Sequence, residues 1–178
     1  MLQECSIIKT AKVFFDEPTK PHYLMEISRK CQIAHTSVKQ HLNTLKKEGI
    51  IKETTEKKGT RSFPTYTASL DSQSYKTNKK IINLITLEES GLIDHIKDKT
   101  FPKTIILFGS YSKGEDLEES DIDLFIESKK TTIDLTRFEN RLKRKIQLHF
   151  RENFRQLPEE LKESVINGQV LRGYLETT

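Results

Sequence analysis

The chain has 178 residues, of which 34% are hydrophobic and 31% are charged, and its formal net charge is +4. This length allows one or two domains with modest cores, and the apolar runs are too short for a membrane-spanning helix. Cys5 and Cys31, the only cysteines, lack the spacing of a zinc site or a disulfide framework, and the first residues lack the layout of a signal peptide. We therefore expect a cytoplasmic protein with no membrane partner.

The first part of the sequence predicts three helices. Residues 4–15 and 23–30 carry apolar side chains at helical spacing. A third helix is expected after the turn "QIAHT", because Val38, Leu42 and Leu45 fall on one helical face. Two short β-rich runs then flank the turn "KKGT" in "IIKETTEKKGTRSFPTYTA". The predicted order is three helices followed by a β-hairpin.

This order comes with a recognisable stretch of sequence. The segment "IAHTSVKQHLNTLKKEGIIKETTEKKGTRSFPTYTA" resembles the winged helix-turn-helix of MarR- and ArsR-like bacterial and archaeal regulators. Those families share a capped third helix, the pattern "L..L...G(I/L)I" and a basic wing. The resemblance covers about residues 1–70 and implies a winged-helix domain that binds duplex DNA. It also implies a homodimer, by analogy alone.

Charge favours the same partner. Residues 1–70 hold 12 Lys/Arg against 7 Asp/Glu, a net charge of +5, whereas residues 71–178 hold 18 against 19, a net charge of −1. A basic module favours nucleic acid, with the third helix in the major groove and the wing tip on phosphates or in the minor groove. The alternative is a protein-docking module with a solvated helix and hairpin. The candidate DNA-binding residues are Ser37, Lys39, Gln40 and Asn43 on the helix, and Lys57, Lys58 and Arg61 on the wing.

The polar stretch "LDSQSYKTN" predicts a domain boundary, which we place after residue 70. The second domain, residues 71–178, begins with a helix at 78–98 that we expect to break near Glu89–Gly91. In chain order it then predicts a buried strand, a second strand, an amphipathic helix, a third strand, and a closing helix with a glycine-punctuated tail, at 103–108, 121–127, 133–144, 145–150 and 158–175.

Two aspartates stand within the second of these strands. Side chains at i and i+2 of a strand project from the same face, so the carboxylates of Asp121 and Asp123 are expected to lie together. Two neighbouring carboxylates are best tolerated around a shared divalent cation, and oxygen ligands suit Mg²⁺ and Mn²⁺. Asp121 and Asp123 are therefore the candidate metal ligands and catalytic residues.

The preceding strand ends on a Gly-Ser pair. Gly109 has no side chain, so a phosphate could approach the backbone closely, and Ser110 would open a short helix with a hydroxyl and free N–H groups. Lys113 adds a positive charge just beyond. These three are the candidate nucleotide-binding residues, and a triphosphate facing metal-bearing aspartates is the layout of nucleotidyl transfer.

The whole stretch "FGSYSKGEDLEESDIDLF" resembles the signature of the DNA-polymerase-beta-like nucleotidyltransferase superfamily: a hydrophobic residue with Gly-Ser, about ten residues, and then Asp-hydrophobic-Asp. Here ten residues, 111–120, separate Ser110 from Asp121. The similarity is greatest to the minimal nucleotidyltransferases and covers roughly residues 80–178. It implies a small α/β domain with a mixed sheet, hence an α+β protein overall. It also implies a nucleoside triphosphate substrate, Mg²⁺ or Mn²⁺, and a protein or small-molecule acceptor.

The sequence departs from this family on the next strand. The superfamily usually places a third carboxylate there, in a pattern like "(K/R)-V-D-L-V", whereas "KIQLHF" has Gln147 at that position. His149, one pair further along the same face, is a candidate replacement, and Glu127 is too far from Asp123, at about 13 Å along the strand. The alternative is that Gln147 and His149 are ordinary polar residues of a half-exposed strand.

Two functions therefore stay open. One is a nucleotidyltransferase with a DNA-binding domain. The other is a DNA-binding regulator whose degenerate nucleotidyltransferase domain senses nucleotide or acts as an antitoxin-like interaction module. Gln147 favours the second function and the intact aspartate pair favours the first.

Overall fold

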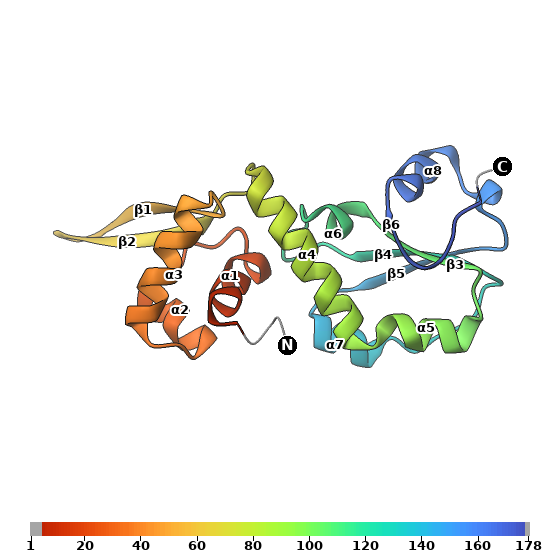
Figure 1. Ribbon diagram of the computed structural model, residues 1–178, viewed down its shortest axis with the longest axis horizontal. Helices are drawn as coiled ribbons and strands as arrows, with labels where there is room; N and C mark the ends of the chain where they lie inside the picture. Colours follow the sequence, from red (N-terminus) through yellow and green to blue (C-terminus); the bar gives the residue numbers. More distant parts are fainter. Residues whose placement is uncertain (1–4, 177–178) are drawn as a thin grey trace. The chain divides into compact units, whose positions relative to one another are not determined.

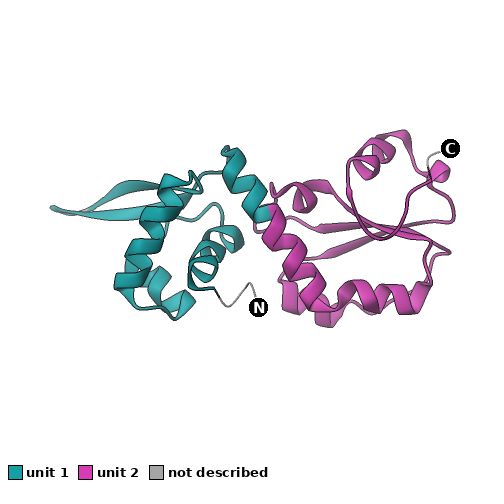
Figure 2. Ribbon diagram, in the orientation of Figure 1, with its two compact units in different colours: residues 1–79 teal, residues 80–178 magenta. Residues whose placement is uncertain are grey.

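The computed structural model describes residues 5–176, except for the side chain of Lys58. It divides into two compact units, residues 1–79 and 80–178 (Figure 2). The division falls inside helix α4 (Gln73–Ser90), later than the domain boundary predicted after residue 70, which stays a prediction. None of the helices in the described residues has the length and apolar character that a membrane crossing requires.

The N-terminal unit has three helices followed by a two-stranded antiparallel sheet (Figure 1), in the order that the sequence predicted. The apolar face of the third helix is buried as expected, with Val38, Leu42 and Leu45 all in the core. Gly59, with a φ of +62°, forms the turn of the hairpin in a conformation that glycine adopts without strain. The elements are α1 (Ser6–Asp16), α2 (Leu24–Cys31), α3 (His35–Lys47), β1 (Ile51–Lys58) and β2 (Arg61–Ala68).

The C-terminal unit is built on a mixed four-stranded sheet with the order β5-β4-β3-β6. Strands β4 and β5 are parallel, and the other neighbours are antiparallel. The predicted break in the first helix is confirmed, because Gly91 separates α4 from the next helix with a φ of +77°. The elements after α4 are α5 (Leu92–Thr100), β3 (Thr104–Phe108), α6 (Gly109–Lys113), β4 (Ile122–Glu127), α7 (Thr136–Leu142), β5 (Ile146–Arg151), η2 (Phe154–Gln156), α8 (Glu159–Ile166) and β6 (Gln169–Gly173).

Strand β6 was predicted only as part of a glycine-punctuated tail. It is an edge strand that pairs with β3, and its residues are partly exposed, so they lack the apolar run of a central strand. Gly168 and Gly173 allow β6 to approach β3 closely enough to pair with it. A Cβ at Gly168 would lie 2.7 Å from the Leu107 carbonyl oxygen, and a Cβ at Gly173 would collide with the Lys103 carbonyl.

Helix α7 is shorter than the predicted helix at 133–144. At its start, the Asp134 side chain accepts a hydrogen bond from the Thr136 backbone N–H, at 3.0 Å. At its end, Lys143 takes a left-handed conformation with a φ of +53°, which stops the helix. A hydrogen bond at its start and a left-handed residue at its end therefore shorten the helix, and Phe138 is the residue that it buries.

The two faces of the sheet carry separate cores, because side chains alternate along each strand. On one face, Leu107 and Leu124 pack with residues of α5 and with Phe138. On the other, Ile106, Phe108 and Phe125 pack with Phe154, Leu157 and Val165 from η2, the turn after it and α8. In Figure 1, α5 and α7 lie on one side of the sheet and α8 on the other. Asp123 has the parity of Phe125, so its side chain projects from the second face.

Candidate functional site

The two aspartates of the Asp-Ile-Asp sequence lie at the start of β4. Asp121 directly precedes the strand, and Asp123 is its second residue. In the sheet register, Asp123 stands opposite Phe108 of β3 and Gln147 of β5. Both side chains are half-buried, and each contacts a side chain of β5. The carboxylates are therefore placed on one face, as the spacing predicted.

Gly109 lies against Asp123. Its φ is +73°, and a Cβ at this position would lie 2.6 Å from Oδ2 of Asp123. The missing side chain thus lets the Asp123 carboxylate approach this residue closely, and the approach of a phosphate to the Gly109 backbone stays a prediction. Ser110 is the second residue of α6, and Lys113 is exposed at its end.

Strand β5 supplies a separate partner to each aspartate. The Gln147 side-chain amide donates a hydrogen bond to Oδ2 of Asp121, with 3.4 Å between Nε2 and Oδ2. His149 Nε2 lies 3.2 Å from Oδ1 of Asp123. The His149 ring also packs edge-on against Phe108, with ring centroids 5.1 Å apart. The position that the sequence analysis aligned with a third carboxylate thus holds a neutral amide beside the pair.

Glu127 plays no part in this cluster. It is buried at the other end of β4, where its Oε1 accepts a hydrogen bond from the Phe154 backbone N–H at 3.2 Å. It therefore fixes the start of η2, in line with the expectation that it is too far away to join the aspartates.

Asp116 holds the loop between α6 and β4, and its role was not predicted. Its side chain is buried, and Oδ1 accepts a hydrogen bond from Nδ2 of Asn83 at 2.8 Å. Arg144, just before β5, contacts Oδ2 at 3.4 Å and also donates to the Glu118 carbonyl. The acidic loop that leads to Asp121 is therefore tied to α4 and to the entry of β5. Nothing in the sequence distinguishes Asp116 from the exposed acids around it.

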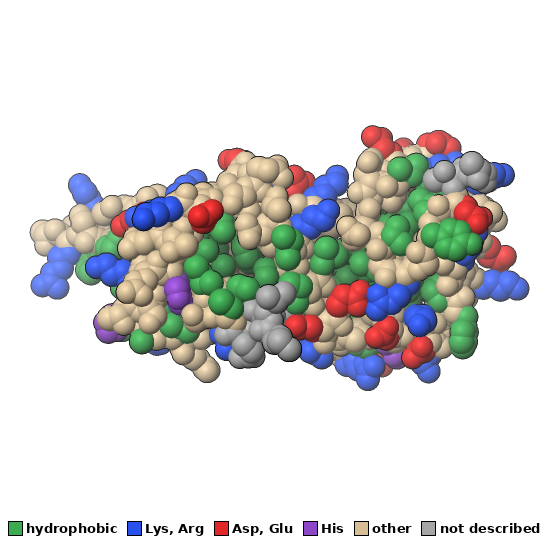
Figure 3. Space-filling view, viewed as in Figure 1, with side chains coloured by type: hydrophobic (Ala, Val, Ile, Leu, Met, Phe, Trp, Pro, Cys, Tyr) green, Lys and Arg blue, Asp and Glu red, His purple; other side chains and the backbone are tan. Residues whose placement is uncertain are grey.

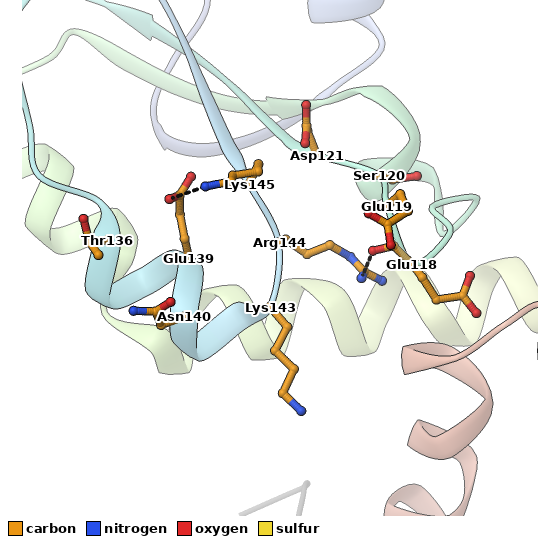
Figure 4. Close-up of a pocket in the computed structure, with 10 residues that line it drawn as sticks. All are labelled: Glu118, Glu119, Ser120, Asp121, Thr136, Glu139, Asn140, Lys143, Arg144 and Lys145. Carbon is orange, nitrogen blue, oxygen red and sulfur yellow. Dashed lines mark hydrogen bonds and ion pairs between the residues drawn. The ribbon is translucent and has the colours of Figure 1, made fainter.

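A hollow of about 300 Å³ borders Asp121 (Figure 4). The acidic loop forms one wall, and α7 with the segment before β5 forms the other. Lys145 and Glu139 form an ion pair across 3.3 Å within it. Charged residues of both signs dominate the lining, which suits a polar ligand: Glu118, Glu119, Ser120, Asp121, Thr136, Glu139, Asn140, Lys143, Arg144 and Lys145.

The donor set at the start of β4 fits a divalent cation. Two half-buried carboxylates supply the oxygen ligands that hard cations prefer, and the adjacent His149 adds a nitrogen. Asp121, Asp123 and Gly109 could thus bring a cation and a phosphate together, with Ser110 and Lys113 on the next helix. Their roles in binding stay predictions.

The candidate DNA-binding residues lie on α3 and at the tip of the hairpin. Lys39, Gln40 and Asn43 are exposed on α3, and Ser37 is partly exposed. Lys57 and Arg61 are exposed near the turn, whereas the Lys58 side chain lies outside the described part of the structure. Figure 3 shows Lys and Arg side chains over this hairpin. The structure brings these residues to two exposed places, and their contact with DNA stays a prediction.

A second polar cluster lies inside the N-terminal unit. Glu17, His22 and Glu26 offer ligand atoms that all lie within 4.8 Å of one another, a geometry that could hold a metal ion. The Lys30 ammonium, however, forms ion pairs with both glutamates, so a cation is already present there. The hydrogen bond from Lys30 lowers the pKa of Glu26 to about 2. The backbone of the buried His22 pairs with Tyr66, which ties the cluster to β2.

Comparisons with known proteins give one family match, within the C-terminal unit, and one short match to a curated relative. Residues 89–171 match the family model described as Nucleotidyltransferase domain. The chain is also 59% identical over 32 residues to a Methanocaldococcus jannaschii protein named "Putative protein adenylyltransferase MJ1379". That match covers 18% of this chain and 32% of the relative, so the chain spans about a third of the relative's length. No solved structure matches the chain significantly. These findings support a nucleotidyltransferase domain at residues 89–171, and the family match does not reach the three N-terminal helices and the hairpin.

Proposed function

We propose that this protein transfers a nucleotidyl group from a nucleoside triphosphate to an acceptor hydroxyl. The observation that carries the proposal is the placement of Asp121 and Asp123 on one face, with Gly109 against Asp123. The family match over residues 89–171 supports the same reaction class. Family members generally use a nucleoside triphosphate and a divalent metal, and the donor set described above fits both.

In this proposal Asp121 and Asp123 hold Mg²⁺ or Mn²⁺, while Gly109, Ser110 and Lys113 hold the triphosphate. The acceptor oxygen attacks the α-phosphorus, the bond to the bridging oxygen breaks, and pyrophosphate leaves. Gln147 cannot take the acceptor proton, because an amide is not a base near neutral pH, and in this proposal the proton passes to solvent. The bound cation would neutralise charge on the transferred phosphate and on the leaving group.

We favour transfer of an adenylyl group to a protein acceptor. The support is the short match to a protein whose name describes a protein adenylyltransferase. The hollow beside Asp121 adds a physical reason, because its charged lining suits a polar side chain that carries the acceptor hydroxyl.

For the N-terminal unit we propose a winged helix that binds duplex DNA, with the protein acting as a cytoplasmic homodimer. Three helices followed by a hairpin, the exposed polar face of α3 and the basic hairpin tip support this assignment. In it, Ser37, Lys39, Gln40 and Asn43 face base edges and phosphates, and Lys57, Lys58 and Arg61 contact the backbone or the minor groove.

The second candidate is a regulator whose C-terminal unit binds nucleotide without transferring it, or serves as an antitoxin-like interaction module. The specific observation in its favour is Gln147, which places a neutral amide where the family usually has a carboxylate. Binding without label transfer would distinguish it from the enzyme.

The test is incubation of the protein with each of the four α-labelled nucleoside triphosphates, Mg²⁺ or Mn²⁺, and a cell extract. We expect labelled protein from one nucleotide, and a fall of about 100-fold or more in Asp121→Asn, the scale on which loss of a charge-stabilising group acts. Asp98→Asn, an exposed aspartate of α5, is the matched control and should label normally. Metal-dependent nucleotide binding with no label transfer would contradict the enzyme and favour the regulator that senses nucleotide.

A further inference from the structure

Strand β5 carries Gln147 and His149 on the face where the family usually has a third carboxylate. Of these two side chains, only the imidazole of His149 is a common metal ligand. We propose that His149 supplies a nitrogen donor to the cation site of Asp121 and Asp123, so that the site prefers a first-row transition-metal ion such as Mn²⁺ to Mg²⁺. This inference rests on the proposed function, because that function is what requires a cation at the aspartates.

The distance between His149 and Asp123 carries the inference. Nε2 and Oδ1 are 3.2 Å apart. Two donors bound at about 2.1 Å in neighbouring positions of an octahedral ion lie about 3 Å apart, so an ion could replace the hydrogen bond between these two side chains with little movement of either. Neutral imidazole is also the commonest metal ligand among protein side chains.

The surroundings of His149 fix the ring in this position. Strand β5 pairs in parallel with β4 through the residues on either side, and the ring packs edge-on against Phe108 of β3. The His149 and Asp123 side chains are 31% and 28% exposed, so an ion between them would be partly shielded yet reachable from solvent. The fold therefore presents a positioned nitrogen beside the carboxylate.

Asp121 is the donor that must move. Its carboxylate is turned to Gln147, and Asp121, Asp123 and His149 do not converge as tightly as Glu17, His22 and Glu26 do in the N-terminal unit. The bond to Gln147 is long, at 3.4 Å, and Gln147 is exposed, so rotation of Asp121 toward the ion breaks one weak hydrogen bond.

The donor chemistry gives the metal preference. Mg²⁺ takes oxygen ligands almost exclusively and sheds its waters reluctantly. Transition-metal ions accept imidazole, and Mn²⁺ also accepts carboxylates. Replacement of a charged oxygen ligand by a neutral nitrogen therefore weakens Mg²⁺ binding and moves the preference to Mn²⁺.

The test uses the full-length protein with Mn²⁺ and no nucleotide. Calorimetry should give tighter binding of Mn²⁺ than of Mg²⁺, by about 10-fold or more, and Asp121→Asn identifies which binding event belongs to this site. Electron spin echo of the bound Mn²⁺ should show coupling to the imidazole nitrogen. His149→Gln, which retains a hydrogen-bonding group for Asp123, should lose both the coupling and the preference, whereas the exposed His35→Gln should lose neither.

Two failures have different meanings. If Mn²⁺ binds in an Asp121-dependent manner and the wild-type protein shows no nitrogen coupling, then His149 is not a ligand and only this inference falls. If no Mn²⁺ binding depends on Asp121, the cation site fails, and the proposed function falls with it. The wild-type spectrum decides the first point even if a variant does not fold.

Discussion

In the C-terminal unit, polar side chains from paired strands meet on one face of a sheet, whereas in the N-terminal unit the predicted DNA-contacting side chains are spread over one helix and one hairpin tip. Asp123, Gln147 and His149 are brought together by the register of β4 and β5. Lys39 and Arg61 are simply exposed. Buried polar groups of the N-terminal unit, such as His22, stabilise the fold. Its charged residues lie mainly on the outer surface.

This difference reflects the structural requirements of the two proposed functions, metal-dependent chemistry and DNA binding. Chemistry at a metal needs donors placed within tenths of an ångström, so it is built on rigid strands with a supporting set of contacts. Attraction to a phosphate backbone needs positive charge at the surface and tolerates mobile side chains. Changes in the C-terminal unit should therefore act through geometry, and changes on the hairpin should act through charge.

The largest expected effect comes from the buried aspartate that supports the site loop. In Asp116→Ala, the amide of Asn83 and the guanidinium of Arg144 are left without their buried carboxylate. Loss of one member of a buried pair costs about 3–5 kcal/mol, which chemical denaturation of the C-terminal unit would measure. Asp98→Ala, at an exposed position of α5, should cost less than about 0.5 kcal/mol. A cost below about 1 kcal/mol for Asp116→Ala would show that the loop does not depend on this carboxylate.

Gly109→Ala should damage the site by geometry. The left-handed backbone costs about 1–2 kcal/mol for a residue with a Cβ, and the new methyl would push against Asp123. Gly91→Ala is the matched control, because it has the same kind of φ, +77°, with nothing within 4 Å of the added Cβ. We expect both variants to lose thermal stability and only Gly109→Ala to lose Mn²⁺ binding. Equal metal binding in the two variants would contradict the close approach.

Removal of charge from the hairpin should weaken DNA binding without disturbing the fold. The plot of log affinity against log salt has a negative slope, and each phosphate that the protein no longer neutralises reduces its magnitude by about 1. Changing Lys57, Lys58 and Arg61 together to Ala should therefore make the slope less negative by about 2–3. Fluorescence anisotropy with duplex DNA at several salt concentrations measures the slope. The same change at Lys97, Lys99 and Lys129, exposed residues of the C-terminal unit, should leave it unaltered. An unaltered slope in the hairpin variant would remove the hairpin from the interface.

The smallest expected effect is on the stability of the protein at low pH. Lys30 lowers the pKa of Glu26 to about 2 in the folded protein, so the unfolded state binds more protons as the pH falls. The stabilisation of the folded state by this ion pair is present when the pH is above the ordinary carboxyl pKa. It is lost as the pH falls from that value to about 2. Because these side chains are more than a third exposed, we expect less than about 1 kcal/mol. Melting temperatures from pH 6 to pH 2 should fall less steeply in Lys30→Ala than in the wild type, and parallel curves would exclude this ion pair as a source of acid sensitivity.

Local sequence pattern predicted the parts of the fold that depend on neighbours in the chain. Short apolar stretches indicated β3 and β4, alternation indicated β5, and helical spacing indicated α3. The break between α4 and α5 was expected near Glu89–Gly91 and lies at Gly91. The parts that depend on distant partners were not predictable. Strand β6 needs β3 beside it, and Asp116 resembles any surface acid until Asn83 and Arg144 are brought to it by the fold.

The same limit applies to the site. The spacing of Asp121 and Asp123 predicted a shared face, because strand geometry is local. Which side chains of β5 meet them is decided by the parallel register, which a single sequence does not encode directly. The alignment of "KIQLHF" placed Gln147 near the pair, but its hydrogen bond to Asp121 and the separate approach of His149 to Asp123 are known only from the structure.

The close approach of Gly109 to Asp123 has a consequence for how related sequences diverge. The carboxylate itself favours glycine here, since a Cβ would lie 2.6 Å from Oδ2 and the Asp123 side chain would have to shift. A descendant that lost the reaction but kept Asp123 would still be held to glycine at this position. Substitution of Asp123 by a smaller residue would relax the steric constraint and leave only the backbone preference. We therefore expect the two positions to change together across homologues more often than unrelated positions do.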